Sequence, residues 1–155
     1  MTGELHVFSD GRTRTGAAGK APLSRRTMLP ATEQAPGMAR QVAREALASW
    51  RLAHLMDTAI LLISELVTNA VLHARNGGSG LVLHLAIHGS WLRIEVHDAD
   101  LHVPQPRTPA SLDESGFGFV LVDSLADNWG VRETATGKAV WAEMDTRHAR
   151  VRLAR

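Results

Sequence analysis

Three polar side chains recur every four residues within a largely apolar segment of the chain. They are Glu65, Asn69 and His73, in residues 55–75. Residues four apart stack along one side of a helix, so a carboxylate, an amide and an imidazole would form one stripe. The carboxylate could accept a proton from a hydroxyl, and the amide oxygen is a hard ligand suited to Mg²⁺. The stripe is therefore either a magnesium–nucleotide site or the solvent-exposed polar side of an amphipathic helix.

The segment that carries this stripe predicts a long core helix. It contains no Gly or Pro, and its apolar residues recur at helical spacing: Leu55, Ala59, Leu62, Ile63, Leu66, Ala70 and Val71. A helix of about 20 residues would be some 30 Å long. One side of this helix would pack on the core and position the polar stripe beside it.

A second, amphipathic helix is expected over residues 36–50, where Pro36 suits the first helical turn. Thr32 or Glu33 should begin its cap. A short strand is expected before it, over residues 26–29. The arginines of this region should point to water: Arg40, Arg44 and Arg51.

Two alternating runs, 81–87 and 91–97, predict a β-hairpin joined at residues 88–90. One face of the hairpin should cover the helices and the other should meet solvent. Three histidines are then expected as exposed strand residues: His84, His88 and His97. A metal cluster is not expected, because strand alternation alone does not make these side chains converge.

Two further features could complete a nucleotide site. Asp98 follows the second strand of the hairpin and could accept a hydrogen bond from an exocyclic amine such as that of adenine. Gly116 and Gly118 precede an apolar segment of helical spacing, so their backbone could approach a phosphate at a helix N-terminus. Taken alone, Asp98 could equally be a turn former, and Gly-x-Gly is a weak signal. The polar, Pro-containing segment 98–115 is long enough to suggest a functional or mobile loop.

The order of the elements predicts an α+β fold. Two more strands are expected at 129–132 and 139–144, with a turn at 135–138. Strands that cluster beside helices imply a two-layer sandwich, and hairpins make its sheet mostly antiparallel, with helices on one face. The expected organisation is a flexible arm (1–24), one domain (25–146) and a basic tail (147–155).

Composition limits the classes of function. A chain of 155 residues with net charge +1 is expected to form one domain without a general pull toward nucleic acid or membranes. Only its termini are basic, and they lack interleaved aromatic residues. The absence of Cys excludes thiolate nucleophiles and Cys–metal sites and suits a reducing cytoplasm. No signal peptide or membrane span is expected.

Two motifs in combination resemble the GHKL superfamily of ATP-binding domains, which includes gyrase and histidine kinases. ISELVTNAVLHA (63–74) resembles its N-box, and SGFGFVLVDSLADNWGV (115–131) looks like its glycine box and the following helix. Asp98 falls where the family has its adenine-binding box, and GKAVWAEM (137–144) is similar to its last strand. The resemblance covers about residues 25–146 and is closest to the bacterial anti-sigma-factor serine/threonine kinases, particularly the regulatory ATP-binding proteins of actinomycetes.

The resemblance implies a Bergerat-type sandwich that binds ATP and Mg²⁺ between its helices and a mobile lid. It implies Glu65 as the general base, Asn69 as the magnesium ligand and Asp98 as the acceptor for the adenine amine. The partners it implies are a sigma factor, an anti-sigma antagonist protein, or both, and a second copy of the chain in a homodimer. It implies a cytoplasmic regulator of transcription.

The resemblance also implies the surroundings of the phosphates. Gly116 and Gly118 would lie beside them, and residues 99–115 would form a lid. His73 matches a frequent family position, as a neighbour of the phosphates or a structural group without a catalytic role.

One motif departs from the family pattern. The adenine box usually continues Asp-x-Gly-x-Gly, whereas here Asp100 stands at the first of these glycines and His102 at the second. A side chain then stands where backbone normally approaches the base. Two functions follow as hypotheses: a protein serine/threonine kinase that phosphorylates an anti-sigma antagonist, or a non-catalytic protein-interaction switch with weak or no nucleotide binding.

Overall fold

The computed structural model describes residues 23–74, 80–98, 116–135 and 137–147. In chain order its elements are β1 (Ser24–Leu29), α1 (Ala35–Ser49), a short 3₁₀-helix (Ala53–Leu55), α2 (Met56–His73), β2 (Leu81–His88), β3 (Trp91–Asp98), α3 (Gly116–Leu125), β4 (Asn128–Thr134) and β5 (Gly137–Asp145). This order of strands and helices is the predicted one. The loop 99–115, the turn residues 76–79, most of the arm and the tail 148–155 lie outside the described residues.

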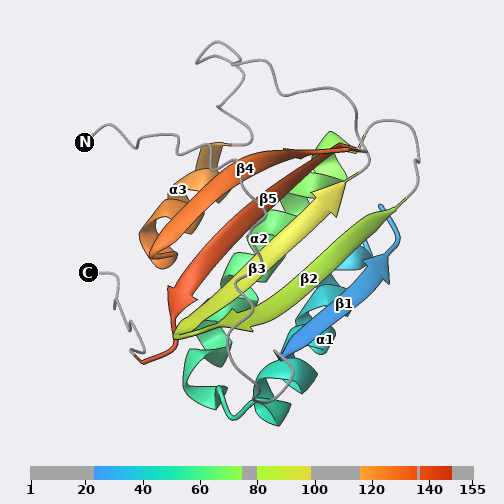
Figure 1. The fold of residues 1–155 in the computed structure, drawn as a ribbon. Helices are drawn as coiled ribbons and strands as arrows, with labels where there is room; N and C mark the ends of the chain where they lie inside the picture. Colours follow the sequence, from blue (N-terminus) through green and yellow to red (C-terminus); the bar gives the residue numbers. More distant parts are fainter. Residues whose placement is uncertain (1–22, 75–79, 99–115, 136, 148–155) are drawn as a thin grey trace.

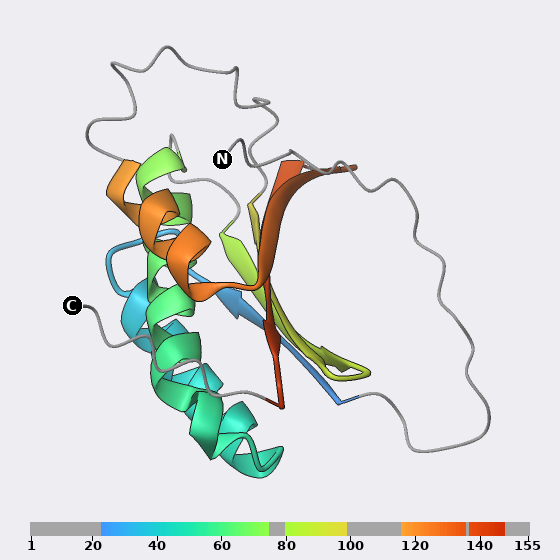
Figure 2. The ribbon, with the colours of Figure 1, turned by 90° about the vertical axis from the view of Figure 1, so that its left-hand side faces the viewer.

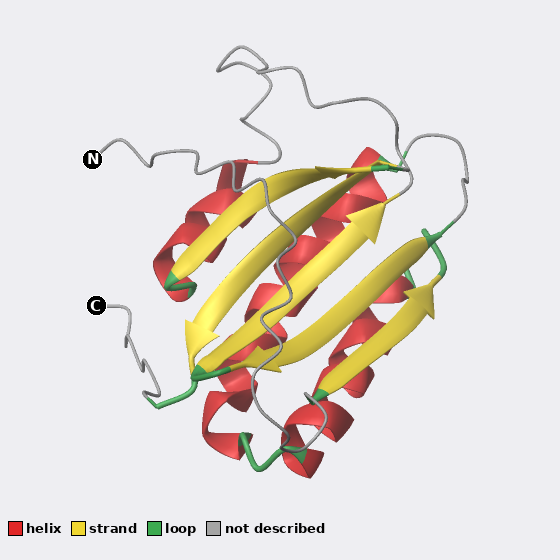
Figure 3. Ribbon diagram, viewed as in Figure 1, coloured by secondary structure: helices red, strands yellow, loops and turns green. Residues whose placement is uncertain are grey.

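The domain has two layers (Figures 1 and 2). Its strands form one five-stranded sheet in the order β1-β2-β3-β5-β4, and every neighbouring pair is antiparallel. Helices α1, α2 and α3 all lie on one face of this sheet, as Figure 2 shows in side view and Figure 3 by secondary structure. The predicted α+β sandwich is therefore confirmed. The opposite face of the sheet carries no helix of the described residues.

The β2–β3 hairpin follows from alternation and a tight turn. Its turn is Gly89-Ser90, and Gly89 adopts a φ of 59° that an L side chain would resist. This turn pairs His88 with Trp91 and so places His84 directly opposite Glu95. On each strand, one set of alternate side chains faces the helices and the other set faces away.

Helix α2 is the central helix of the core, as predicted. Leu62, Ile63 and Leu66 on it are almost completely buried, and they belong to the same apolar cluster as Leu85 and Ile94 of the sheet. Each such side chain stabilises the fold by about 1.5–3 kcal/mol when fully buried. By length and composition alone, residues 53–73 could also cross a membrane, but the packing shown here is that of a core helix.

The start of α1 corrects two expectations. Gln34, rather than Thr32 or Glu33, occupies the N-cap and makes no side-chain capping bond. Thr32 instead accepts a hydrogen bond from the Gln34 backbone N–H at 3.4 Å. Arg40 does not simply point to water: it is half-buried, and its Nη1 donates to Ser64 Oγ on α2 at 3.4 Å.

Helix α3 forms the crossover that brings β5 beside β3. It packs against α2, and its Val122 is fully buried, whereas Val120 is largely exposed. The Trp129 indole Nε1–H at the start of β4 donates to Asp123 Oδ1 on α3 at 2.9 Å, which ties the helix to the edge strand. Because β5 returns between β3 and β4, side chains far apart in the sequence share the central strands.

Candidate functional site

The three residues of the predicted stripe on α2 are not equally exposed. Asn69 is buried, with 7% of its surface exposed, while Glu65 and His73 are half-buried. All three belong to the C-terminal half of a helix whose other side packs into the core. The stripe is thus more enclosed than the solvated side of a surface helix would be.

Asn69 carries an orphaned polar atom. Its side-chain Nδ2 is buried and has no hydrogen-bond partner among the described residues. A buried amide without a partner costs roughly 1–3 kcal/mol, and such groups are rare in folded proteins. The side chain therefore suits a polar ligand, and its oxygen is the donor type that Mg²⁺ prefers.

Asp98 is the last residue of β3 and is buried, with 7% of its surface exposed. It has the same parity along the strand as Ile94 and Val96, the positions that face the helices. Its neighbours across the sheet are Leu81 on β2 and Lys138 on β5. The carboxylate is therefore placed at the end of the sheet on its helix-covered side, where an ionised group needs hydrogen-bond donors.

Gly116 and Gly118 lie in the first turn of α3, whereas the sequence predicted that they would precede the helix. The first turn of a helix has backbone N–H groups without helical partners, and these can bind an anion. The end of α2, the end of β3 and the start of α3 all lie at the same end of the molecule in two perpendicular views (Figures 1 and 2). The expected lid, residues 99–115, lies outside the described residues.

A second polar group lies on the uncovered face of the sheet and centres on Glu95. Arg93 Nε donates to Glu95 Oε1 at 2.7 Å, and Arg132 Nη2 donates to Oε2 at 3.1 Å. His97 Nε2 lies 2.7 Å from the same Oε2. Arg93 also reaches Glu143 Oε2 at 3.4 Å. One carboxylate thus joins side chains of β3 and β4, strands that are separated in the sheet by β5.

The environment shifts the pKa values of two groups on this face. Burial opposes ionisation of Glu95, but hydrogen bonds from His97 and Arg93, with the charges of Arg93 and Arg132, hold its pKa well below the usual range. Burial lowers the pKa of His84, against the opposing charge of Glu95, and the positive charge of Arg26 lowers it further. Glu95 is therefore ionised and His84 neutral near neutral pH.

The uncovered face is hollowed around this network. A depression of about 270 Å³ opens there, lined by Arg26, His84, Ala86, His88, Arg93, Glu95, His97 and Arg132. It lies across the sheet from α2, so it is separate from the expected nucleotide site. Among the described residues that line it, Glu95 is the single carboxylate, so basic side chains outnumber acidic ones there.

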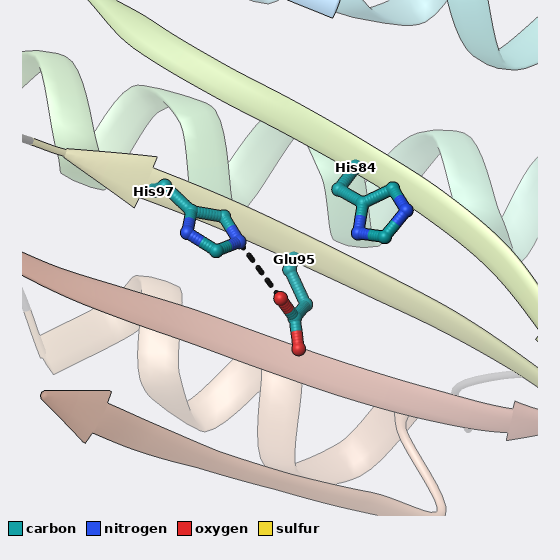
Figure 4. A group of neighbouring side chains, drawn as sticks. All are labelled: His84, Glu95 and His97. Atoms are coloured by element: carbon teal, nitrogen blue, oxygen red, sulfur yellow. Dashed lines mark hydrogen bonds and ion pairs between the residues drawn. The ribbon is translucent and has the colours of Figure 1, made fainter. Parts of the chain in front are cut away.

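The expectation for the three histidines was correct for His88 and wrong for the other two. His88 is exposed, but His84 and His97 are half-buried and converge on Glu95 (Figure 4). One potential ligand atom from each of these three residues lies within 4.8 Å of the other two. The hairpin register was a usable signal, since a two-residue turn at 89–90 places His84 opposite Glu95. The contribution of Arg132 required the tertiary structure.

The fold and its motifs define a histidine kinase-like ATPase domain. The model of that family matches residues 29–144, and the chain belongs to it. The resemblance to the GHKL superfamily is thereby confirmed, and ATP binding is the property that this family implies.

Two similar proteins can be named. The uncharacterized protein SCO4941 of Streptomyces coelicolor is 31% identical over 83 residues, which cover 52% of this chain and 79% of that protein. The crystal structure of the RsbU and RsbW domains of Rv1364c from Mycobacterium tuberculosis matches with a TM-score of 0.61 and 24% identity. That match covers 79% of this chain and 31% of the other, so the chain spans about a third of the longer protein and shares its fold.

Proposed function

We propose that this chain is an ATP-binding regulator of the anti-sigma type that acts as a protein serine/threonine kinase. It would transfer the γ-phosphate of ATP to a Ser or Thr hydroxyl of a small antagonist protein. Membership of the histidine kinase-like ATPase family supports nucleotide binding. The sequence resemblance to anti-sigma-factor kinases supports the choice of substrate and of a sigma factor or antagonist as partner.

The single observation that carries the proposal is the orphaned amide of Asn69. That Nδ2 is buried and has no hydrogen-bond partner among the described residues. Rotating the amide about its last bond exchanges oxygen and nitrogen, so the site can present the oxygen to a cation. A bound magnesium–nucleotide would satisfy the group and remove its desolvation cost.

The proposed roles follow from the chemistry of each side chain. Glu65, one turn before Asn69 and half-buried, would accept the proton of the attacking hydroxyl. Asp98 would accept a hydrogen bond from the exocyclic amine of adenine, since an ionised carboxylate is acceptor-only. The α3 N-terminus, with Gly116 and Gly118, would bind the phosphates through backbone N–H groups. His73 would lie beside them without a catalytic role.

Mg²⁺, held by the Asn69 oxygen, would neutralise charge that develops on the phosphoryl oxygens. Catalysis of this kind consists mainly of positioning and electrostatic stabilisation, so it needs no covalent intermediate on the protein. In the proposed mechanism, helix α2 thus supplies both the proton acceptor and the magnesium ligand. The sheet supplies the carboxylate that binds adenine.

The test is an ATP titration by calorimetry, with and without Mg²⁺, on wild type and on Asn69→Ala. We expect Mg²⁺ to strengthen ATP binding to the wild type, and we expect this enhancement to be lost in the variant. Ser124→Ala, an exposed position on α3, is a control that should behave as wild type. Equal magnesium enhancement in Asn69→Ala would overturn the assignment of the ligand.

A specific feature favours a second function. Asp100 and His102 stand where the family pattern has glycines. Side chains therefore occupy positions where the family's backbone approaches the adenine base. The second candidate is therefore a switch without turnover, which binds a sigma factor or another regulator and binds nucleotide weakly or not at all. Micromolar ATP binding that vanishes in Asp98→Asn would contradict a nucleotide-free switch. Phosphate transfer to the antagonist would then distinguish the kinase from a non-catalytic ATP-binding regulator.

A further inference from the structure

The group His84, Glu95 and His97 has the composition of a transition-metal site. Two imidazoles and one carboxylate are ligands that Zn²⁺ takes in proteins, and three protein ligands leave a fourth position for water. His84 comes from β2, while Glu95 and His97 come from β3, so a paired hairpin supplies all three. A hairpin with fixed register is a rigid support, because the backbone hydrogen bonds hold the strands in place.

The distances are close to those needed for a shared ion. One potential ligand atom of each residue lies within 4.8 Å of the others. Zinc bonds of about 2.0–2.1 Å place tetrahedral ligand atoms roughly 3.4 Å apart. His97 Nε2 and Glu95 Oε2, at 2.7 Å, must therefore separate slightly, while His84 must approach. The first pair must separate by about 0.7 Å and the His84 atom must approach by at most about 1.4 Å, and side-chain rotations can supply both movements.

The surroundings orient the ligands as an outer shell does in metal sites. Ser24 Oγ lies 3.2 Å from His84 Nε2. When that nitrogen donates its hydrogen to Ser24, the lone pair of the ring lies on Nδ1. Figure 4 shows one ring nitrogen of His84 turned toward Glu95. The carboxylate itself is held by Arg93 and Arg132.

Arg93 and Arg132 also limit the affinity of the site for a metal ion. Their positive charges repel a cation, and Arg26 also lines the depression. Arg93 shares its charge with Glu143, and its guanidinium carbon lies 4.4 Å from the centre of the Trp141 ring, which offers further compensation. The depression is open to solvent, so water can complete the coordination. A moderate rather than a tight site is the expected result of this balance.

We propose that His84, Glu95 and His97 form a binding site for a divalent transition-metal ion of the zinc class on the uncovered face of the sheet. Binding replaces the hydrogen bond between His97 and Glu95 by an ion between Nε2 and Oε2. The hydrogen on Nε2 moves through solvent to Nδ1, so that His97 binds the ion as a neutral imidazole. The site is independent of the proposed nucleotide site, because it lies on the other side of the sheet.

The experiment titrates Zn²⁺ into the full chain, without nucleotide, against a chromophoric chelator. The variants are His84→Ala, His97→Ala and Glu95→Gln, with His88→Ala as the matched control. His88 lines the same depression on the same strand as His84 but lies outside the group. Circular dichroism confirms that each variant is folded. A second readout is the rise in unfolding temperature that Zn²⁺ causes, because a ligand that binds the native state stabilises it.

We expect wild type and His88→Ala to bind one equivalent of zinc that excess Mg²⁺ does not displace, since Mg²⁺ prefers oxygen ligands. His84→Ala and His97→Ala should lose at least about tenfold in affinity, and with it the thermal stabilisation. Asn69→Ala should bind zinc as wild type does, so failure of the nucleotide site and of this site can be told apart. The proposal is overturned if wild type binds no zinc in competition, or if the group variants bind it as well as His88→Ala.

Discussion

Asn69 on α2 and Asp98 on β3 are buried to the same degree, with 7% of each residue exposed, although one belongs to the helix layer and the other to the sheet. Polar side chains at such positions need partners, because the desolvation of an unpaired buried group is unfavourable. The described residues give the Asn69 Nδ2 none. The proposed magnesium–nucleotide site would supply Asn69 with such a partner.

The carboxylate of Asp98 should determine the affinity for adenine nucleotides. Asp98→Asn keeps the shape but replaces one acceptor oxygen by a donor, which would face the donor amine of adenine. We expect ATP affinity to fall by at least about tenfold, or 1.4 kcal/mol, as measured by calorimetry. Asp57→Asn, an exposed position at the start of α2, should bind ATP as wild type does. If Asp98→Asn retains the wild-type affinity for ATP, the carboxylate does not bind the adenine amine.

Glu65 should affect phosphate transfer much more than binding. Glu65→Gln removes the proton acceptor but keeps the size of the side chain, so we expect transfer to the antagonist protein to slow by about 10²–10⁴-fold. ATP affinity should change little. Transfer is followed with labelled ATP, and Glu33→Gln, an exposed position before α1, is the control. A variant that transfers phosphate at the wild-type rate would assign the base elsewhere.

Gly130 should be required for packing on the uncovered face. A Cβ built there would lie 2.9 Å from Cζ2 of the Trp141 ring, which is closer than side chains normally approach. Gly130→Ala should therefore destabilise the fold by about 1–3 kcal/mol, measured by urea unfolding. Gly37→Ala is the matched control, because its Cβ would meet the end of Arg40 at an ordinary 3.6 Å. Equal effects of the two substitutions would mean that the indole moves aside at little cost.

His84 should make the stability of the fold depend on pH near neutrality. Burial lowers its pKa in the folded chain below the ordinary value of 6.5. As the pH falls through that value, the unfolded chain takes up a proton that the folded chain does not, so stability decreases. Urea unfolding between about pH 7.5 and 5.5 should show this loss, and His84→Gln should reduce it. An unchanged pH slope in His84→Gln would contradict the assignment.

Glu95 should also make the fold less stable as the pH falls, but in the acid range. Its pKa lies well below the ordinary value of 4.5, so the stability that its ionised form contributes is fully present above that value. As the pH falls below about 4.5, the unfolded chain protonates first, and stability is lost progressively. Glu95→Gln should flatten the acid limb of an unfolding curve recorded against pH. Glu133→Gln, an exposed position on β4, is the control.

Several elements could be predicted from the sequence because their determinants are local. The uninterrupted apolar periodicity of α2 and the alternation of β2 and β3 depend on residues a few positions apart. The start of α1 was less predictable, because Gln34 occupies the N-cap without a side-chain capping bond and helix boundaries vary by one or two residues. The partner of Arg40 on α2 was beyond local reasoning, since Ser64 lies in a different helix.

The sequence by itself determined the polar residues of the α2 stripe, the alternation of the hairpin and the family to which the chain belongs. Only the tertiary structure decided that Asn69 is buried without a partner for its Nδ2 among the described residues, and that His84 and His97 converge on Glu95. It also decided that Arg132 reaches Glu95, because β5 returns between β3 and β4. The physical reason is that periodicity states which face a side chain occupies, whereas burial and contact depend on the elements that pack around it.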